Sequence, residues 1–323
     1  MTAALQELPL CSLVVPSYRR PAQLSGCLAA LAELDYPGER LEVIVVDDGG
    51  DIPLDPVVRR FEGTLDVRLL RVTHGGQARA RNLAAREARG ELLAFTDDDC
   101  RPTRSWLRLL AERYLADPGN AYGGHTVNIL ADNAYAATSQ LVLDLGYAQQ
   151  NVDRTSAHFF TSNNLVVPAG GFRTVEGFDE RFRTSEDRDF CDRWIAAGMT
   201  LTYVPEAIVL HAHPLTLKRF VRQHFQYGRG AFLFHRARSR RWSQPVRIDP
   251  GFHFKVMTHP LRTETGRRAA KLTLLLQVWN LANTAGFLWE WAHSRGGPAA
   301  SAARGSDASP VEPVAPRRDP LPK

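Results

Sequence analysis

The sequence predicts an α/β fold in which helices cover both faces of a doubly wound, mostly parallel sheet, with a helical extension toward the C-terminal end. Short apolar runs typical of strands alternate along the first half with segments of helical periodicity. The expected strands are residues 11–15, 41–46, 65–72 and 92–95, and the expected helices are 22–34, 77–88 and 106–115. Parallel strands need long crossover connections, usually helices, so this alternation favours a parallel sheet.

A polar segment follows each expected strand. These segments are PSYR at 16–19, DDGG at 47–50, HGG at 74–76 and TDDD at 96–99. In open α/β sheets, ligands bind in the crevice outside the carboxyl ends of the strands. We therefore expect the four segments to converge on one site.

Composition and charge limit the class of protein. The 323 residues are 44% hydrophobic, which excludes a chain that is disordered throughout. The net charge of +5 is mild, but residues 216–272 hold 14 Lys and Arg against only Asp249 and Glu264. This excess predicts a surface that meets phosphates, anionic lipid or an acidic partner. The basic stretch contains no recognition helix or RNP motif, so no nucleic-acid partner is expected.

The cysteines and the first residues indicate a cytoplasmic protein. The four cysteines, Cys11, Cys27, Cys100 and Cys191, form no CxxC pair, so neither a zinc site nor a disulfide framework is expected. The first residues, MTAALQELPLCSLVV, lack the pattern of a secretion signal. We also expect the basic region to place the protein peripherally on the inner face of the cell membrane.

Three adjacent carboxylates, Asp97, Asp98 and Asp99, follow the last expected strand. Adjacent carboxylates raise one another's pKa and cost stability unless a cation neutralises them. Mg²⁺ and Mn²⁺ prefer oxygen ligands and keep open positions for substrate phosphates, so we expect one of these ions here. The alternative is an acidic surface turn before the next helix.

No glycine cradle for phosphates is present, because the sequence has neither GxGxxG nor a Walker A motif. Phosphates would then be held by the metal and by arginines such as Arg79 and Arg81, although Arg79 also fits a solvated helix face. Asp47 and Asp48 end the second strand, where a carboxylate can accept a hydrogen bond from a ribose hydroxyl or a base N–H. The alternative is a plain turn at the glycines that follow.

The second half is less regular. Residues 121–160 show no clear pattern, and a helix is expected from Glu186 onward, with Ser185 as its cap and acidic residues in its first turn. Residues 271–293 approach the length of a membrane span, but polar residues interrupt them, so an interfacial or core helix is expected. Residues 294–323, rich in Pro, Ala, Ser and Arg, are expected to be a disordered tail.

The motifs together resemble one family. SLVVPSYRRP, VIVVDDGG, GGQARARN, LLAFTDDDC, VEGFDERF, SEDRDFCDRW and RQHFQYGRGA occur in this order over residues 10–234. Their order and spacing are similar to those of inverting family 2 glycosyltransferases of the GT-A fold. The segment RQHFQYGRGA departs from the QxxRW pattern of processive synthases, which argues against a processive polymerase.

The resemblance implies a role for each matching position. Asp97 and Asp99 resemble the DXD pair, with Asp99 as the usual metal ligand, and His211 or His213 resembles a histidine that reaches the metal or diphosphate. Asp187 aligns with the catalytic base, and Glu186 competes for that role. The residues implied in nucleotide-sugar binding are Pro16, Tyr18, Arg19, Asp47, Asp48, Arg81, Asp97, Asp98 and Arg229.

The sequence thus predicts a metal-dependent inverting glycosyltransferase that uses a nucleotide-diphosphate sugar, expected to be a UDP-sugar. The expected acceptor is a carbohydrate, lipid-linked or small-molecule hydroxyl. The expected domains are a GT-A domain at 1–235, with a nucleotide-sugar half at 10–120 and an acceptor half at 121–235, a basic and aromatic extension at 236–293, and the tail. A silent sugar-nucleotide or membrane-binding module and a sugar-nucleotide nucleotidyltransferase are the alternatives.

Overall fold

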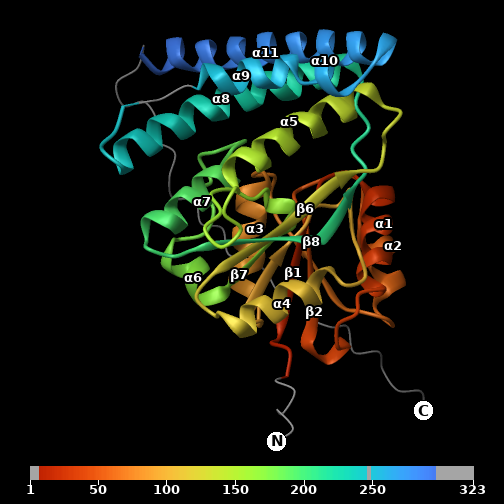
Figure 1. The fold of residues 1–323 in the computed structure, drawn as a ribbon. Helices are drawn as coiled ribbons and strands as arrows, with labels where there is room; N and C mark the ends of the chain where they lie inside the picture. The colour runs from red at the N-terminus through yellow and green to blue at the C-terminus, as the bar shows by residue number, and fades with distance from the viewer. Residues whose placement is uncertain (1–6, 246–248, 296–323) are drawn as a thin grey trace, which may run out of the picture.

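A mixed sheet of eight strands forms the centre of the computed structural model, which describes residues 7–245 and 249–295 (Figure 1). The strand order is β3-β2-β1-β4-β7-β6-β8-β5. The strands are β1 (Cys11–Ser17), β2 (Leu41–Asp47), β3 (Asp66–Arg71), β4 (Leu92–Phe95), β5 (Cys100–Pro102), β6 (Ala121–Asn128), β7 (Leu165–Pro168) and β8 (Leu201–His211). The helices are α1 (Pro21–Ala32), α2 (Asp55–Val58), α3 (Gln77–Glu87), α4 (Trp106–Ala116), α5 (Ala134–Gln150), α6 (Ala169–Thr174), α7 (Glu186–Ala196), α8 (Leu217–Arg241), α9 (Pro250–Thr258), α10 (Pro260–Thr263) and α11 (Gly266–Arg295), with short 3₁₀ turns η1 (Gly38–Arg40), η2 (Arg59–Phe61) and η3 (Ser162–Asn164).

The predicted α/β fold class and the four predicted strands are confirmed. Strands β3, β2, β1 and β4 run parallel, with Leu13 opposite Val43 on one side and Ala94 on the other. Strand β7 joins β4 and β6 in antiparallel pairings, β8 runs parallel to β6, and β5 pairs antiparallel with β8 at the edge. All seven residues of β1 and of β2 are buried, as expected for central strands covered on both faces.

Two hydrophobic cores lie on the two faces of the sheet. Alternating residues of β1 supply both, with Leu13 and Val15 in the core that includes α1 and α4, and Val14 in the core that includes α3 and α7. The irregular region expected at 121–160 contains β6 and the 17-residue helix α5. Two glycines in β6 and the mixed polarity of α5 weaken the periodicity on which sequence prediction depends.

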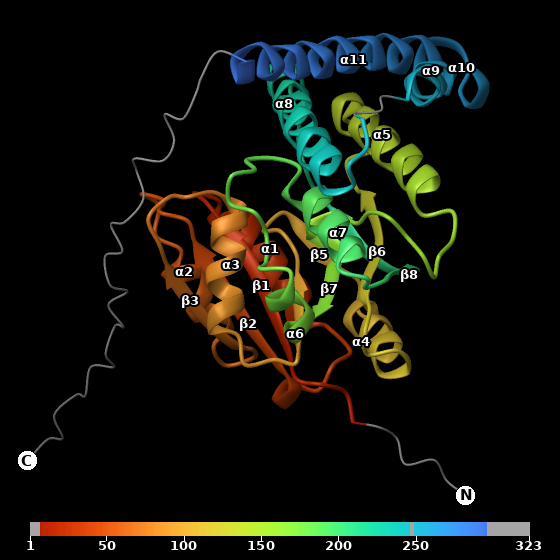
Figure 2. The ribbon, with the colours of Figure 1, turned by 90° about the vertical axis from the view of Figure 1, so that its left-hand side faces the viewer.

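A layer of helices lies above the sheet (Figures 1 and 2). Helices α8, α9, α10 and α11 stack with α5 above the sheet, and α11 is outermost (Figures 1 and 2). A third apolar cluster, which includes Phe220, Leu276 and Trp279, holds this layer together. Residues 271–293 therefore lie within a helix that packs on the protein, which agrees with the expectation of a core helix. Among the described helices, none combines the length and apolar content that a bilayer crossing requires. The expected tail at 294–323 lies almost wholly outside the described residues.

Candidate active site

A cavity of about 1300 Å³ lies where the parallel strands end. Its walls include the segments after β1, β3 and β4, the first turn of α7, the end of β8 and the inner faces of α5 and α8. All four predicted polar segments therefore contribute to one site, although the segment at 47–50 does so only through Asp48. The helical layer forms the opposite wall, with Trp279 and Asn283 of α11 among its residues.

The three adjacent aspartates point to three different sets of partners. Asp97 Oδ1 accepts a hydrogen bond from Arg81 at 2.6 Å. Asp98 accepts from Ser17 Oγ at 2.7 Å and from Arg20 Nη1 at 3.0 Å. Burial raises the pKa of Asp98 to about 6, against the opposing charge of Arg20. Arginine charges and hydrogen-bond donors of the protein therefore offset part of the repulsion between the adjacent aspartates.

Asp99 is the carboxylate with the surroundings of a metal ligand. Its two oxygens lie 3.3 Å from His211 Nε2 and 3.3 Å from His213 Nδ1, and Arg20 Nη1 lies 3.0 Å away. Burial by itself raises the pKa of Asp99, but hydrogen bonds from both histidines and the charge of Arg20 hold it well below its ordinary value. Asp99 is therefore ionised over the whole physiological pH range.

The donor set at Asp99 fits a divalent cation. Ligand atoms of Asp99, Cys100 and His211 lie within 4.8 Å of one another. Burial raises the pKa of the Cys100 thiol far above its ordinary value, so the thiolate that a metal would bind is costly to form. A carboxylate and one or two imidazoles remain as possible ligands, and this set leaves positions for phosphate oxygens on a divalent cation.

Arg81 connects the aspartate segment to α7. Its guanidinium is fully buried and donates to Asp97, to Glu186 Oε1 at 3.0 Å and to Gln77 Oε1 at 3.0 Å. The sequence predicted that Arg81 contacts the nucleotide, but the structure places its charge between two protein carboxylates, behind the cavity wall. Arg81 therefore positions Asp97 and Glu186.

Glu186 and Asp187 begin α7 at the cavity. Glu186 is buried and accepts a hydrogen bond from Arg81. Asp187 is half-buried, lines the cavity and accepts a hydrogen bond from the Arg188 backbone N–H at 2.8 Å. Burial raises the pKa of Glu186, the charge of Asp187 adds to this, and Arg81 opposes it. This geometry makes Asp187 the more accessible proton acceptor of the two.

Burial raises the pKa of Asp187, and the charge of Arg188 opposes this increase. One expectation about the start of α7 is wrong. Ser185 precedes the helix, as predicted, but its side chain makes no capping hydrogen bond. Instead Ser185 adopts a left-handed backbone conformation with φ of 69°, which turns the chain sharply into α7.

Aromatic and backbone groups form another part of the cavity wall. Tyr18 stacks on His74 with ring centroids 4.5 Å apart, and Pro16 lies beside them in the wall. Both oxygens of Asp48 accept backbone N–H groups, from Gly75 at 2.8 Å and Gly76 at 2.9 Å. Asp48 therefore holds the loop between β3 and α3 in place next to the aromatic pair.

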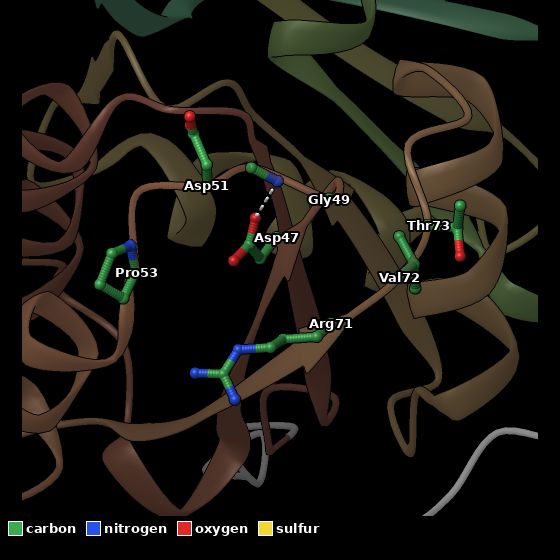
Figure 3. Close-up of a pocket in the computed structure, with 8 residues that line it drawn as sticks. Asp47, Gly49, Asp51, Pro53, Arg71, Val72 and Thr73 are labelled. Carbon is green, nitrogen blue, oxygen red and sulfur yellow. Dashed lines mark hydrogen bonds between the residues drawn. The ribbon is translucent and has the colours of Figure 1, made fainter.

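Asp47 lines a different hollow. Neighbouring residues at a strand end point to opposite sides, so Asp47 faces away from Asp48. Figure 3 shows this second hollow, of about 610 Å³, with Asp47 and Arg71 on its walls and the bond from the Gly50 N–H to Asp47 Oδ1. The structure thus does not bring Asp47 to the larger cavity.

Two predicted arginines also lie outside the larger cavity. Arg19 Nε binds Asp51 at 2.6 Å on the surface. Arg229 Nε binds Glu290 of α11 at 2.8 Å, and its guanidinium lies 4.1 Å from the centre of the Trp289 ring. The expected contact of Arg229 with the donor diphosphate is not supported, because its guanidinium forms an ion pair with Glu290 that links α8 to α11. Tyr227, from the same motif, does line the cavity.

Sequence reasoning missed Arg20 and Gln223. Arg20 contacts Asp98 and Asp99, and Gln223 Oε1 lies 2.8 Å from His213 Nε2. The only sequence signal for Arg20 is its place just before Pro21, the first residue of α1. Arg19 has a positive φ of 59°, and this local turn decides which of the two adjacent arginines reaches the aspartates.

Comparisons with known proteins show which proteins the chain is similar to. The chain is 34% identical over 198 residues to the pre-mycofactocin glycosyltransferase of Mycobacterium tuberculosis, covering 59% of this chain and 42% of that relative, so it spans less than half of that protein. It is 26% identical over 231 residues to glycosyltransferase AglE of Haloferax volcanii, covering 69% of this chain and 73% of the relative.

Solved structures share the fold. The mannosyltransferase PcManGT from Pyrobaculum calidifontis, in complex with GDP-Man and Mn²⁺, superposes with a TM-score of 0.65 at 19% identity, covering 88% of each chain. TarS 1-349 of S. aureus, in complex with UDP-GlcNAc, gives 0.58 at 14% identity, covering 88% of this chain and 92% of that one. The predicted GT-A fold is therefore confirmed. The model of the family described as glycosyl transferase family 2 matches residues 12–175, half of the chain, and the chain belongs to that family.

Proposed function

We propose that the protein is a metal-dependent inverting glycosyltransferase, which moves a sugar from a nucleotide-diphosphate sugar to an acceptor hydroxyl in one displacement. The observation that carries the proposal is the presence, in one cavity, of an ionised carboxylate with two histidines and of a second, accessible carboxylate, Asp187. A sugar nucleotide needs both, because its diphosphate must leave and the acceptor must lose a proton.

The donor would lie along the wall formed by the ends of β1 and β4. The aromatic pair Tyr18–His74 offers a surface on which a base can stack, and Asp48 fixes the adjoining loop. Asp99 and His211, with His213, would hold a divalent cation, which supplies charge neutralisation for the departing diphosphate when it is bound. We propose UDP as the nucleotide, although the sugar nucleotides in the solved neighbours differ, GDP-Man in one and UDP-GlcNAc in the other.

Asp187 would act as the general base. It takes the proton of the acceptor hydroxyl while that oxygen forms a bond to the anomeric carbon, on the face opposite the diphosphate. The bond between the anomeric carbon and the diphosphate oxygen breaks, and its electron pair leaves with the nucleotide, so the configuration inverts. A pKa raised by burial makes Asp187 a stronger base than an exposed aspartate.

The acceptor would enter between α5, α7 and α8, where the cavity wall is rich in polar and aromatic side chains. Gln149, Gln150 and His158 offer hydrogen bonds, and Phe159 and Trp242 offer faces on which a ring can pack. These groups suit a carbohydrate, lipid-linked or small-molecule acceptor. The proposal includes peripheral contact with an anionic membrane, supported by the basic excess at residues 216–272.

Calorimetric titration of UDP, GDP and dTDP, with and without Mn²⁺, tests the donor and the metal together. We expect one nucleotide to bind only with Mn²⁺ in the wild type, and the metal effect to disappear in Asp99→Ala. Asp117→Ala, at an exposed position directly after α4 that does not line the cavity, is the control. Binding of no nucleotide in either metal state would overturn the proposal, and binding without donor turnover would favour the silent module.

A further inference from the structure

The outer side of α11 carries a line of exposed leucines. The inner side packs on the protein through Leu272, Leu276 and Trp279, which are buried. Leu274, Leu281 and Leu288 are 65%, 69% and 54% exposed. They are spaced by seven residues, which is within about 20° of two full helical turns, so they lie along one side of the helix. Figures 1 and 2 show that this helix is the outermost layer of the molecule.

Adjoining helices of the same layer add to this apolar exposure. Phe254 of α9 and Leu261 of α10 are each 61% exposed. Single exposed apolar side chains are ordinary, but several in one outer layer mark a surface that contacts something other than water. The spacing along α11 makes this surface long and narrow, as expected for a helix that lies flat on another body.

Basic side chains accompany the leucines. Arg267 and Lys271, both exposed, precede Leu274 on the same side of α11, and exposed Arg262 precedes them in α10. The acidic side chains described between residues 249 and 295 already have partners. Asp249 accepts from Gln149, Glu264 binds Arg268 at 3.0 Å, and Glu290 binds Arg229. The layer therefore presents apolar groups together with positive charge that local carboxylates do not neutralise.

We propose that the outer face of α11, defined as Arg267, Lys271, Leu274, Leu281 and Leu288, lies flat on an anionic lipid surface. The leucines enter the boundary between headgroups and acyl chains, and the two cations contact lipid phosphates. A second copy of the chain is the weaker candidate, because the same face of a second copy brings further cations and no carboxylate to neutralise them. The inference names the surface for the proposed membrane contact and does not depend on transfer activity.

The same helix then connects lipid and cavity. Trp279 and Asn283 on its inner side belong to the cavity wall, while Leu281 and Leu288 face outward. One helix, α11, therefore lies between the proposed lipid surface and this part of the cavity wall. An acceptor whose hydroxyl is attached to a membrane lipid would therefore have a short path into the cavity.

Co-sedimentation of the full chain with vesicles tests the proposal. Vesicles of phosphatidylcholine alone are compared with vesicles that also contain phosphatidylglycerol. We expect the wild type to bind the anionic vesicles, and Leu281→Glu to weaken binding about tenfold or more, because one buried leucine is lost and a charge is placed in the lipid. Arg267→Glu with Lys271→Glu should also weaken binding by at least about tenfold and lower its salt dependence.

Matched variants on the sheet domain serve as controls. Ile52→Glu changes an exposed apolar residue and Arg86→Glu with Arg113→Glu changes two exposed cations, and both should bind as the wild type does. Thermal unfolding checks that each variant is folded, and nucleotide binding, measured separately, reports on the transfer proposal. Failure of the wild type to bind anionic vesicles, or binding by the α11 variants equal to that of the wild type, overturns the inference. A wild-type dimer that Leu281→Glu converts to a monomer without affecting lipid binding would assign the face to a second copy.

Discussion

Asp99 and Asp187 show how surroundings give two aspartates opposite properties. Two histidines and Arg20 hold the pKa of Asp99 well below its ordinary value, despite burial. Asp187 lacks such donors, so burial raises its pKa. The first is suited to remain charged beside a cation, and the second is suited to accept a proton.

Asp187→Asn should remove the proposed base without disturbing the donor site. We expect kcat to fall by about 10²- to 10⁴-fold, the usual contribution of general base catalysis, with metal-dependent nucleotide binding unchanged. Steady-state kinetics together with calorimetry measure the two effects. Asp132→Asn, at an exposed position, should leave both as in the wild type. Loss of nucleotide binding in Asp187→Asn would instead indicate a donor-site role.

The pH dependence of the reaction should show the raised pKa of Asp187. The proposed base acts only when ionised, so kcat/KM should rise with pH through its pKa and then level off. This acid limb should lie above pH about 3.9, the ordinary value for an aspartate. In Asp187→Asn the residual rate should lack this limb. A limb that remains unchanged in the variant would point to another group, such as Asp98.

Arg81→Met should lower the stability of the fold. It leaves Asp97 and Glu186 without their common cation, and removal of one member of a buried charge network costs about 3–5 kcal/mol. Chemical denaturation measures this change. Arg79→Met is the matched control, because Arg79 is exposed on the same helix, and a change within about 0.5 kcal/mol is expected. Equal effects in the two variants would contradict the positioning role.

At the scale of elements, two glycines determine how closely α8 and α11 approach. A Cβ at Gly228 would lie 1.9 Å from the backbone oxygen of Asn283, and a Cβ at Gly286 would lie 1.9 Å from that of Phe225. Each glycine thus allows the backbone of the other helix to pass at contact distance. Phe220 and Trp279 then pack in the cluster beside this crossing.

Gly228→Ala should therefore destabilise the protein, although alanine normally favours a helix over glycine by about 1 kcal/mol. Separation of the helices should cost about 1–3 kcal/mol, as overpacking usually does. Gly146→Ala in α5 is the control, because nothing lies within 4 Å of its added Cβ, and it should be neutral or stabilising. Thermal unfolding distinguishes the two signs. A stabilised Gly228→Ala protein would show that the crossing can relax.

At the scale of the whole molecule, the helical layer is connected to the proposed metal ligands. Gln223 of α8 binds His213 at 2.8 Å, and His213 in turn faces Asp99. A hydrogen bond to one imidazole nitrogen fixes the orientation of the ring and the role of the other nitrogen. The layer therefore closes the cavity and also orients a residue at the end of β8.

Gln223→Ala should weaken metal binding although Gln223 is outside the proposed ligand set. Loss of such an outer contact typically costs about 10- to 100-fold in metal affinity. Mn²⁺ binding followed by electron paramagnetic resonance measures this directly, without turnover. Gln149→Ala, on the cavity wall in α5, should bind Mn²⁺ as the wild type does. Unchanged affinity in Gln223→Ala would contradict the proposed role of Gln223 in orienting His213 for the metal.

Local pattern was sufficient for much of the site. The triple aspartate after β4 and the acidic first turn of α7 follow from a strand end and a helix start, whereas His211 and His213 were implied only by the family resemblance. The sequence did not distinguish Arg20 from Arg19, or reveal that Arg229 binds Glu290 of α11. These outcomes depend on a positive φ at one residue and on a partner 61 residues away in the chain, and neither has a local signature.

The sequence by itself determined the fold class, the parallel half of the sheet and the edge at which the polar segments meet, because hydrophobic periodicity and strand ends are local properties. Only the tertiary structure decided which carboxylates are charged, which arginine reaches them and which face of α11 remains exposed. These properties depend on burial and on partners brought together from distant parts of the chain. Desolvation and ion pairing act over a few ångströms in space, whatever the separation in sequence.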